Sequence, residues 1–240
     1  MKQDERDAAL ARVNLFWLPL GAGDASRSVR MNGLVFEAIT ARHQKRDRQD
    51  LFHAALEVQL GTDRWTIEMA PVWGNEDAER GVVCEGPVWA SWLGRSRYFR
   101  YEVRRWRDGR IPDASSAVDS PLPVSTDAAR AQRLLAIVPS FPALRWGRDP
   151  GGTGDMWNSN SLVAWLLAGS GHDVSAIEPP HGGRAPGWHA GLALSSTGSV
   201  RNPADGLKGG QGRDRTADLP RPATTVAITT AGAAPGQYVG

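Results

Sequence analysis

Residues 51–71 constrain the fold of this chain more than any other segment. Apolar and polar side chains alternate along Leu51–Leu60 and again along Arg64–Pro71. Such alternation is typical of β-strands that bury one face. Only Gly61–Thr62–Asp63 separates the two runs, and a loop this short joins antiparallel neighbours. The sequence therefore predicts an antiparallel β-hairpin over residues 51–71.

Further strands are predicted mostly in the first half of the chain. The apolar runs that indicate them are Val13–Leu20, Val82–Trp89 and Tyr98–Trp106. The pair Asn32–Gly33, inside Val29–Ala38, predicts a tight hairpin turn. A last short strand is predicted at Ala190–Leu194. Because the strands follow one another closely, we expect an antiparallel sheet.

Two main helices are predicted in the second half. The stretch Pro112–Asp127 is rich in Pro, Ser and Asp and is predicted to be a loop. Ser125 or Thr126 can cap a helix that follows this loop and ends at Pro139. Asn158–Ser161 supplies caps for a second, strongly apolar helix. Strands followed by helices predict an α+β fold, with an antiparallel sheet packed on two main helices.

The chain divides into three parts. Residues 1–12 are a charged lead-in, residues 13–195 form a single α+β domain, and residues 196–240 are expected to be a disordered tail. Gly, Ala, Thr and Pro dominate this tail, which has no pattern that could bury a core. Its stretch GGQGRDRTADLPRP resembles spurious reading-frame extensions over transfer-RNA genes. A genuine disordered tail is the alternative interpretation.

Composition excludes several classes of protein. With 240 residues, of which 41% are apolar and 22% charged, the chain is no collagen, coiled coil or disordered protein. Its one cysteine, Cys84, excludes an internal disulfide and a four-thiolate metal site. The longest apolar run, Val13–Leu20, is far shorter than the roughly 20 residues of a membrane helix. We therefore expect a cytoplasmic protein with no membrane span, cofactor or bound metal.

Charge gives a weak indication of nucleic-acid binding. Residues 201–240 carry five basic and three acidic side chains, which accounts for the whole net charge of +2. The rest of the chain is neutral and is not drawn to phosphate by its overall charge. Arg95–Arg110 interleaves seven arginines with four aromatic residues, a combination that can bind single-stranded nucleic acid. The same alternation is typical of a half-buried strand.

Three polar features are candidates for a functional site: His53, Glu68 and Asn158–Ser161. If the hairpin is symmetric about Leu60–Gly61, His53 lies opposite Glu68 on the polar face. If the turn is centred nearer Thr62, the two residues move apart. A short hydroxyl residue at a helix start lies where the helix dipole stabilises negative charge. Each feature also has a structural interpretation, as an exposed histidine, a surface carboxylate and a set of helix caps.

The hairpin HAALEVQLGTDRWTIEMAP resembles the histidine hairpin of the permuted papain-like superfamily, which includes NlpC-type peptidases and lecithin:retinol acyltransferase-like proteins. In that pattern a histidine opens one strand and a polar residue lies near the end of the next, at His53 and Glu68. WNSNSLVAWLLAGSG resembles the family's Asn-Cys-Asn-Ser helix start. Asn158 and Asn160 match this motif, but Ser159 replaces the nucleophilic cysteine. The resemblance covers residues 10–195.

The resemblance implies a hydrolase or acyl-transfer protein that acts on an amide or ester. Ser159 would be the nucleophile, His53 the general base and Glu68 the residue that orients it. A serine hydroxyl needs such a base, because a helix terminus alone does not deprotonate it. The neighbouring residues assigned to ligand binding are Trp157, Asn158 and Asn160.

Two alternatives remain open from the sequence. A catalytically inactive module could use the same cleft to bind a peptide or acyl ligand. Nucleic-acid binding through Arg95–Arg110 is the other alternative. Cys84 lies in an apolar stretch and is interpreted as a small buried residue rather than a nucleophile.

Overall fold

A computed structural model describes residues 10–20, 47–72 and 81–197. The turn expected at Asn32–Gly33 lies outside these residues, as do residues 1–9 of the lead-in and residues 198–240 of the expected tail.

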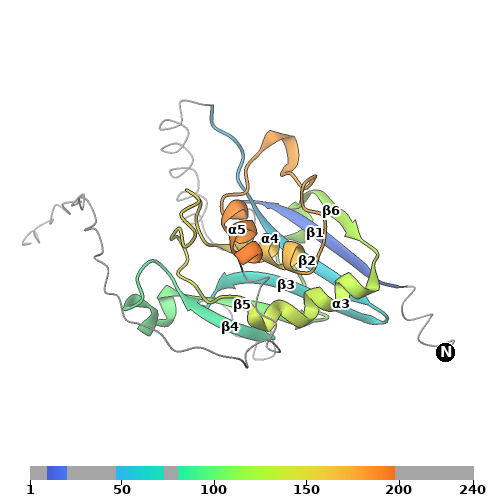
Figure 1. Cartoon of the computed structure of the whole chain (residues 1–240), viewed down its shortest axis with the longest axis horizontal. Helices are drawn as coiled ribbons and strands as arrows, with labels where there is room; N and C mark the ends of the chain where they lie inside the picture. The colour runs from blue at the N-terminus through green and yellow to red at the C-terminus, as the bar shows by residue number, and fades with distance from the viewer. Residues whose placement is uncertain (1–9, 21–46, 73–80, 198–240) are drawn as a thin grey trace, which may run out of the picture. The chain divides into compact units, whose positions relative to one another are not determined.

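The described strands form one six-stranded antiparallel sheet in the order β4-β5-β3-β2-β1-β6 (Figure 1). The strands are β1 (Arg12–Pro19), β2 (Phe52–Leu60), β3 (Asp63–Pro71), β4 (Val82–Pro87), β5 (Arg100–Arg107) and β6 (Val118–Ser125). The hairpin predicted over residues 51–71 is confirmed as β2 and β3. Its alternating pattern identified both strands because one face of the sheet is buried in the core.

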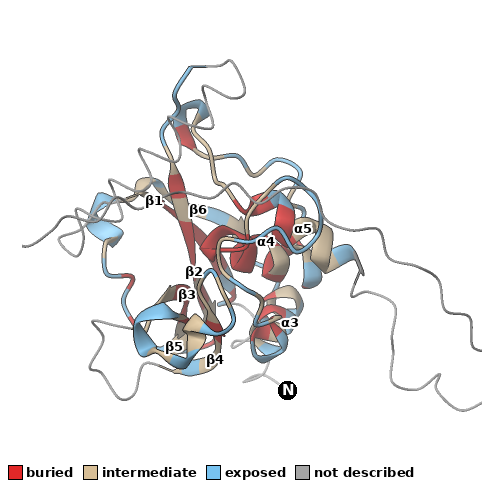
Figure 2. Cartoon of the chain, turned by 90° about the vertical axis from the view of Figure 1, so that its left-hand side faces the viewer, coloured by how far each residue is buried: buried red, intermediate tan, exposed pale blue. Residues whose placement is uncertain are grey.

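The α-helices of the described residues, three in number, lie on one side of the sheet (Figure 2). They are α3 (Ala128–Ile137), α4 (Ser159–Gly169) and α5 (Trp188–Thr197). Short 3₁₀ turns connect the elements at Leu93–Arg95, Arg97–Phe99, Ala114–Ser116, Val138–Ser140 and Pro180–Gly182. The α+β class and the antiparallel sheet are confirmed, and the described residues contain three α-helices where two main helices were expected.

The main core lies between the sheet and these helices. Alternate residues of the central strands point into it, among them Leu15, Leu56 and Ile67, none of which is exposed to solvent. Leu134 of α3 and Leu166 of α4 meet them from the helical side and are also fully buried. The intervening residues of each strand necessarily face the other side of the sheet.

The stretch Pro112–Asp127 is not only the predicted loop, because it contains strand β6. Pro121 and Pro123 lie within this strand, and because prolines are typical of loops, the sequence did not predict a strand here. Proline cannot donate to a β-ladder, so it is tolerated mainly in edge strands. β6 is an edge strand, paired with β1 alone among the described strands.

The prediction of a strand at Ala190–Leu194 is wrong, because these residues lie in α5. The run was too short to separate strand from helix periodicity. Gly191 allows α5 to lie close to α4: a Cβ atom on it would be 2.3 Å from the Ser161 carbonyl oxygen. The helix continues through Ser196 and Thr197, so it extends beyond the predicted end of the domain at residue 195.

Candidate functional site

The turn of the β2–β3 hairpin determines where His53 and Glu68 lie. Leu60 pairs with Asp63 and Leu56 with Ile67, so the hairpin is centred between Gly61 and Thr62. This is the second of the two registers considered from the sequence, and it does not set His53 opposite Glu68. His53 instead pairs with Leu18 on β1, and Glu68 pairs with Arg104 on β5.

Glu68 belongs to a buried cluster of charges. Arg104 donates from Nη1 to Glu68 Oε1 at 2.8 Å and from Nε to Glu102 Oε1 at 2.6 Å. The exposed fractions of Glu68, Glu102 and Arg104 are 8%, 0% and 2%. Burial raises the pKa of Glu68, although the nearby Arg104 guanidinium opposes the rise. In this structure Glu68 is therefore held by an arginine and not by a histidine.

His53 lies on the side of the sheet away from α4. Its neighbours Phe52 and Ala54 point into the helix-covered core, so His53 points to the opposite face. There its cross-strand partner Leu18 belongs to a smaller apolar cluster. The ring keeps some exposure, but burial lowers the pKa of His53 to about 4, which makes it neutral and only weakly basic at pH 7.

Ser159 is the first residue of α4, as the cap pattern predicted. Asn158 caps the helix: its Oδ1 accepts from the amides of Asn160 at 2.9 Å and Ser161 at 3.4 Å. Ser161 completes a capping box by accepting from the Asn158 amide at 3.1 Å. The Ser159 hydroxyl has no hydrogen-bond partner in the described part of the chain, neither His53 nor any other base.

The amides that flank Ser159 hold the chain rather than a ligand. Asn160 donates from Nδ2 to the carbonyls of Phe52 at 2.9 Å and Pro186 at 2.8 Å. Asn158 donates to the same Pro186 carbonyl at 2.7 Å. Ser161 donates to the carbonyl of Gly187 at 2.8 Å. The motif thus ties the segment before α5 to both β2 and α4.

The three residues assigned to binding are all buried. Trp157 is fully buried and stacks on Phe141, with ring centroids 4.9 Å apart. Asn158 and Asn160 are 9% and 2% exposed, and their amide groups bond backbone atoms as described above. None of the three lines the groove described next.

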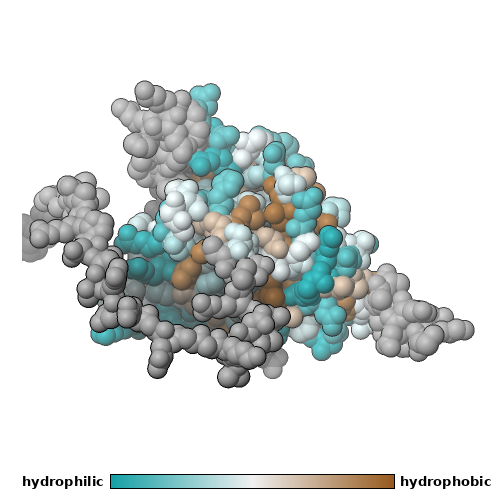
Figure 3. All heavy atoms as spheres, viewed as in Figure 1, coloured by the Kyte–Doolittle hydropathy of each residue, from teal (hydrophilic) through white to brown (hydrophobic). Residues whose placement is uncertain are grey.

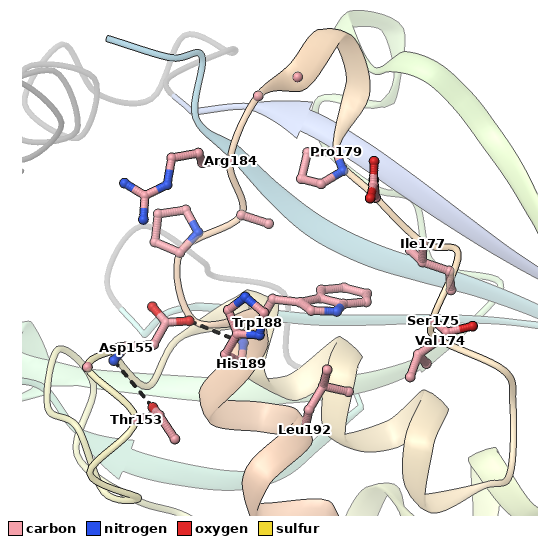
Figure 4. Close-up of a pocket in the computed structure, with 16 residues that line it drawn as sticks. Thr153, Asp155, Val174, Ser175, Ile177, Pro179, Arg184, Trp188, His189 and Leu192 are labelled. Atoms are coloured by element: carbon pink, nitrogen blue, oxygen red, sulfur yellow. Dashed lines mark hydrogen bonds between the residues drawn. The ribbon is translucent and has the colours of Figure 1, made fainter. Parts of the chain in front are cut away.

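A groove of about 700 Å³ opens beside α5 (Figure 4). Three segments of chain form it: residues 153–155, residues 174–186 and the first turns of α5. Apolar lining side chains are Val174, Ile177, Ala185, Trp188 and Leu192; polar ones are Asp155, Ser175, Glu178, Arg184 and His189. On the same face, apolar residues gather over α5 and α4 (Figure 3). This size and mixture suit a small organic ligand or a short chain segment.

Asp155 fixes the start of α5 at one end of the groove. Its carboxylate accepts from the amide of Gly187 at 2.6 Å. It also accepts from the amide of His189 at 3.2 Å (Figure 4). It therefore satisfies amides that would otherwise be unpaired at the helix start and opposes the positive end of the helix dipole. An anionic ligand gains little there, since a carboxylate already occupies the position.

Sequence reasoning missed the groove. Its wall depends on Pro186 and Gly187, whose carbonyls are bonded by Asn158, Asn160 and Ser161 across more than twenty residues of sequence. The one available signal was the cluster of Pro and Gly before α5, which indicates a shaped loop but not what it encloses.

Most arginines of Arg95–Arg110 are engaged within the fold. In addition to buried Arg104, Arg100 pairs with Glu85 at 2.6 Å, and Arg107 pairs with Asp63. Arg105 bonds the carbonyl of Leu135 and lies 5.5 Å from the ring centroid of Trp65. The strand part of this segment is thus a half-buried strand, as the alternative interpretation held.

Within the described ranges, no three His, Cys, Asp or Glu side chains are grouped so that they could hold a metal ion. No helix there is long and apolar enough to cross a membrane. A scan of family models and searches of curated proteins and of solved structures find no match to this chain.

Proposed function

We propose that this chain is a papain-like domain that binds a peptide or acyl ligand without turning it over. The observation that carries the proposal is the separation of the three candidate catalytic residues. Ser159 lies at the start of α4, His53 points to the other face of the sheet, and Glu68 is held by Arg104. A serine without an adjacent base is a poor nucleophile.

The groove beside α5 supports the choice of ligand. Ile177, Trp188 and Leu192 offer apolar surface for an alkyl chain or for the side chains of a peptide. Arg184 adds a guanidinium, a group that donates to amide, ester or carboxylate oxygens, and the Ser175 hydroxyl, which donates to Asp173, can still accept from an amide N–H. The asparagines around Ser159 hold the Pro186 carbonyl in place and so preserve the shape of this wall.

The competing proposal is hydrolysis of an amide or ester through Ser159. The free hydroxyl at a helix start favours it, because the helix dipole would stabilise developing negative charge. It requires His53, or another base, to come within hydrogen-bond reach of Ser159. Neither His53 nor Glu68 bonds Ser159 among the described residues.

A fluorophosphonate reagent separates the two proposals. The binding module predicts no covalent labelling of the wild-type chain at neutral pH. Labelling that disappears in both Ser159→Ala and His53→Ala would support the hydrolase and contradict the binding module.

Ligand binding is measured with dansyl undecanoate as the acyl probe and a set of fluorescein-labelled N-acetyl octapeptides as peptide probes. We expect at least one of them to bind, and Ile177→Glu to abolish that binding by placing a charge in the apolar wall. Leu10→Glu is the matched control, because Leu10 is 57% exposed and does not line the groove. Circular dichroism verifies that both variants fold. Absence of binding by every probe, or equal loss in the control, would contradict the proposal.

A further inference from the structure

The segment between β4 and β5 exposes an unusual set of large aromatic side chains. This segment, residues 88–99, is called the aromatic loop below. Trp92, Tyr98, Trp89 and Phe99 are 72%, 68%, 60% and 40% exposed. In the described ranges the only other large apolar residues so exposed are Leu10 and Val82, and Val82 lies on the adjoining strand β4. Figure 2 shows much of the loop in the pale blue of exposed residues.

The loop backbone is anchored, so this exposure does not come from an unformed segment. Trp89 has a φ of 64°, a left-handed conformation that is unfavourable for a bulky residue. Its amide donates to the carbonyl of Trp146 at 3.0 Å, and its own carbonyl accepts from Arg148 Nε at 3.1 Å. Ser96 caps the 3₁₀ turn Arg97–Phe99. These bonds hold the aromatic rings at the surface.

Four exposed arginines lie in the aromatic loop and in the segment bonded to it. Arg95 and Arg97 lie in the loop, and Arg145 and Arg148 lie in the segment that bonds it; all four are exposed. None of the four forms an ion pair with a described residue, whereas Arg100, at the start of β5, pairs with Glu85. Residues 86–100 and 141–148 contain no Asp or Glu. The surface therefore concentrates positive charge, although residues 1–200 as a whole carry equal numbers of basic and acidic side chains.

We propose that the aromatic loop docks this chain on an anionic lipid bilayer. Trp and Tyr are the side chains that favour the boundary between headgroups and acyl chains. Basic side chains near them gain electrostatic attraction to anionic lipids. Binding of this kind places a protein on a membrane without any spanning helix. The loop supplies both components within one short stretch of chain.

A bilayer fits this surface better than a nucleic-acid strand. Single-stranded nucleic acid runs along a charged groove with rings as successive platforms. The arginines of β5 that could have continued such a groove are engaged in the fold, namely Arg104, Arg105 and Arg107. The remaining rings lie in the aromatic loop beside the edge strand β4, and the remaining charges lie in that loop and in the segment that bonds it.

Co-sedimentation of the full chain with vesicles tests the proposal. We expect it to bind phosphatidylcholine vesicles that contain about one-third phosphatidylserine, and to bind pure phosphatidylcholine much more weakly. Raising salt from about 0.1 M to about 0.5 M should weaken the binding, because the basic side chains are exposed. Equal binding to both vesicle types would contradict the charge component.

Paired variants separate the two components. Trp92→Ser/Tyr98→Ser and Arg95→Glu/Arg97→Glu should each weaken binding about tenfold or more. The matched controls are Leu10→Ser and Arg110→Glu, which change an exposed leucine and an exposed arginine outside the loop and should bind as wild type.

Two outcomes would overturn the proposal. One is vesicle binding by the loop variants that equals that of the wild type, or no vesicle binding at all. The other is loop-dependent binding of a fluorescein-labelled oligothymidylate without vesicle binding, which would assign this surface to nucleic acid.

Discussion

The two faces of the sheet bury polar groups in different ways. On the face covered by helices, the polar residues at the start of α4 are neutral, and Asn160 and Ser161 bond backbone carbonyls. On the opposite face the polar groups are ionisable, and Arg104 bonds both Glu68 and Glu102. Each set has a structural purpose, so neither needs a substrate to explain its burial. Ser159 and the ionisable cluster therefore lie on opposite sides of the sheet, so the cluster does not assist Ser159 as a catalytic carboxylate would.

The same contrast has energetic consequences. A buried neutral group that loses its partner costs about 1–3 kcal/mol of stability. A buried charge that loses its partner costs more, about 3–5 kcal/mol, since the remaining ion cannot be solvated. Substitutions on the two faces should therefore differ in how much they lower the free energy of unfolding. The predictions below run from the largest expected loss to the smallest.

The largest effect is expected from Arg104→Met, which leaves two buried carboxylates without their cation. We expect the free energy of unfolding at pH 7 to fall by about 3–5 kcal/mol, measured by urea denaturation. Arg107→Met is the control, because Arg107 pairs with Asp63 in an exposed position and should cost less than about 1 kcal/mol. A loss for Arg104→Met no greater than for the control would mean that the cluster is not buried as described.

Asn160→Ala should have the next largest effect. It removes the two bonds from Nδ2 and leaves the Phe52 carbonyl without that donor, at a cost of about 1–3 kcal/mol in the same assay. Ser159→Ala is the neighbouring control and should change stability by no more than about 0.5 kcal/mol. If Ser159→Ala were the more destabilising of the two, the hydroxyl would have a partner that the structure does not place there.

A smaller effect should appear in the pH dependence of stability. The pKa of His53 is about 4 in the folded chain, against an ordinary value of 6.5. Between these values the unfolded chain binds a proton that the folded chain does not, so the His53 contribution is complete above pH 6.5 and is lost as the pH falls towards 4. The raised pKa of Glu68 acts with the opposite sign.

The difference in stability between the wild type and His53→Gln, measured as a function of pH, gives the contribution of the histidine alone. We expect the variant to lose less stability than the wild type between pH 6.5 and 4, measured by urea denaturation at several pH values. Parallel stability curves for the two proteins would show that His53 is solvated, not buried on the far face.

Local patterns predicted the elements that depend on neighbouring residues. The β2–β3 hairpin follows from alternation, and the start of α4 follows from the caps at Asn158 and Ser161. The helix α3 also begins near its predicted cap, although Asp127 supplies the capping oxygen rather than Ser125 or Thr126.

The predictions that were wrong concern features that depend on contacts between distant segments of the chain. β6 tolerates its prolines because it lies at the sheet edge. The helix α5 packs closely on α4 at Gly191, a contact that the short apolar run Ala190–Leu194 does not reveal. The separation of His53 from Glu68 follows from a hairpin register displaced by a single residue at its centre. In a β-sheet such a small displacement changes which side chains meet.

The environment of individual site residues could not be predicted from the sequence either. Glu68 appears in the sequence as a polar residue between apolar ones, and only the pairing of β3 with β5 reveals Arg104 beside it. The residues that line the groove carry no periodic signal, since their positions depend on Asp155 and on the asparagines that hold the loop.

The thiol pKa of Ser159→Cys tests most directly whether Ser159 lacks a base. It is measured from thiolate absorbance, with the Ser159→Cys/His53→Ala double variant and the wild type alongside. The wild type gives the thiolate absorbance of Cys84 alone, whose pKa is raised by burial. We predict a modest lowering of the new thiol's pKa by the helix start alone, identical in the single and double variants. A larger lowering that His53→Ala reverses would contradict the account, because it would show that His53 and residue 159 form a catalytic pair.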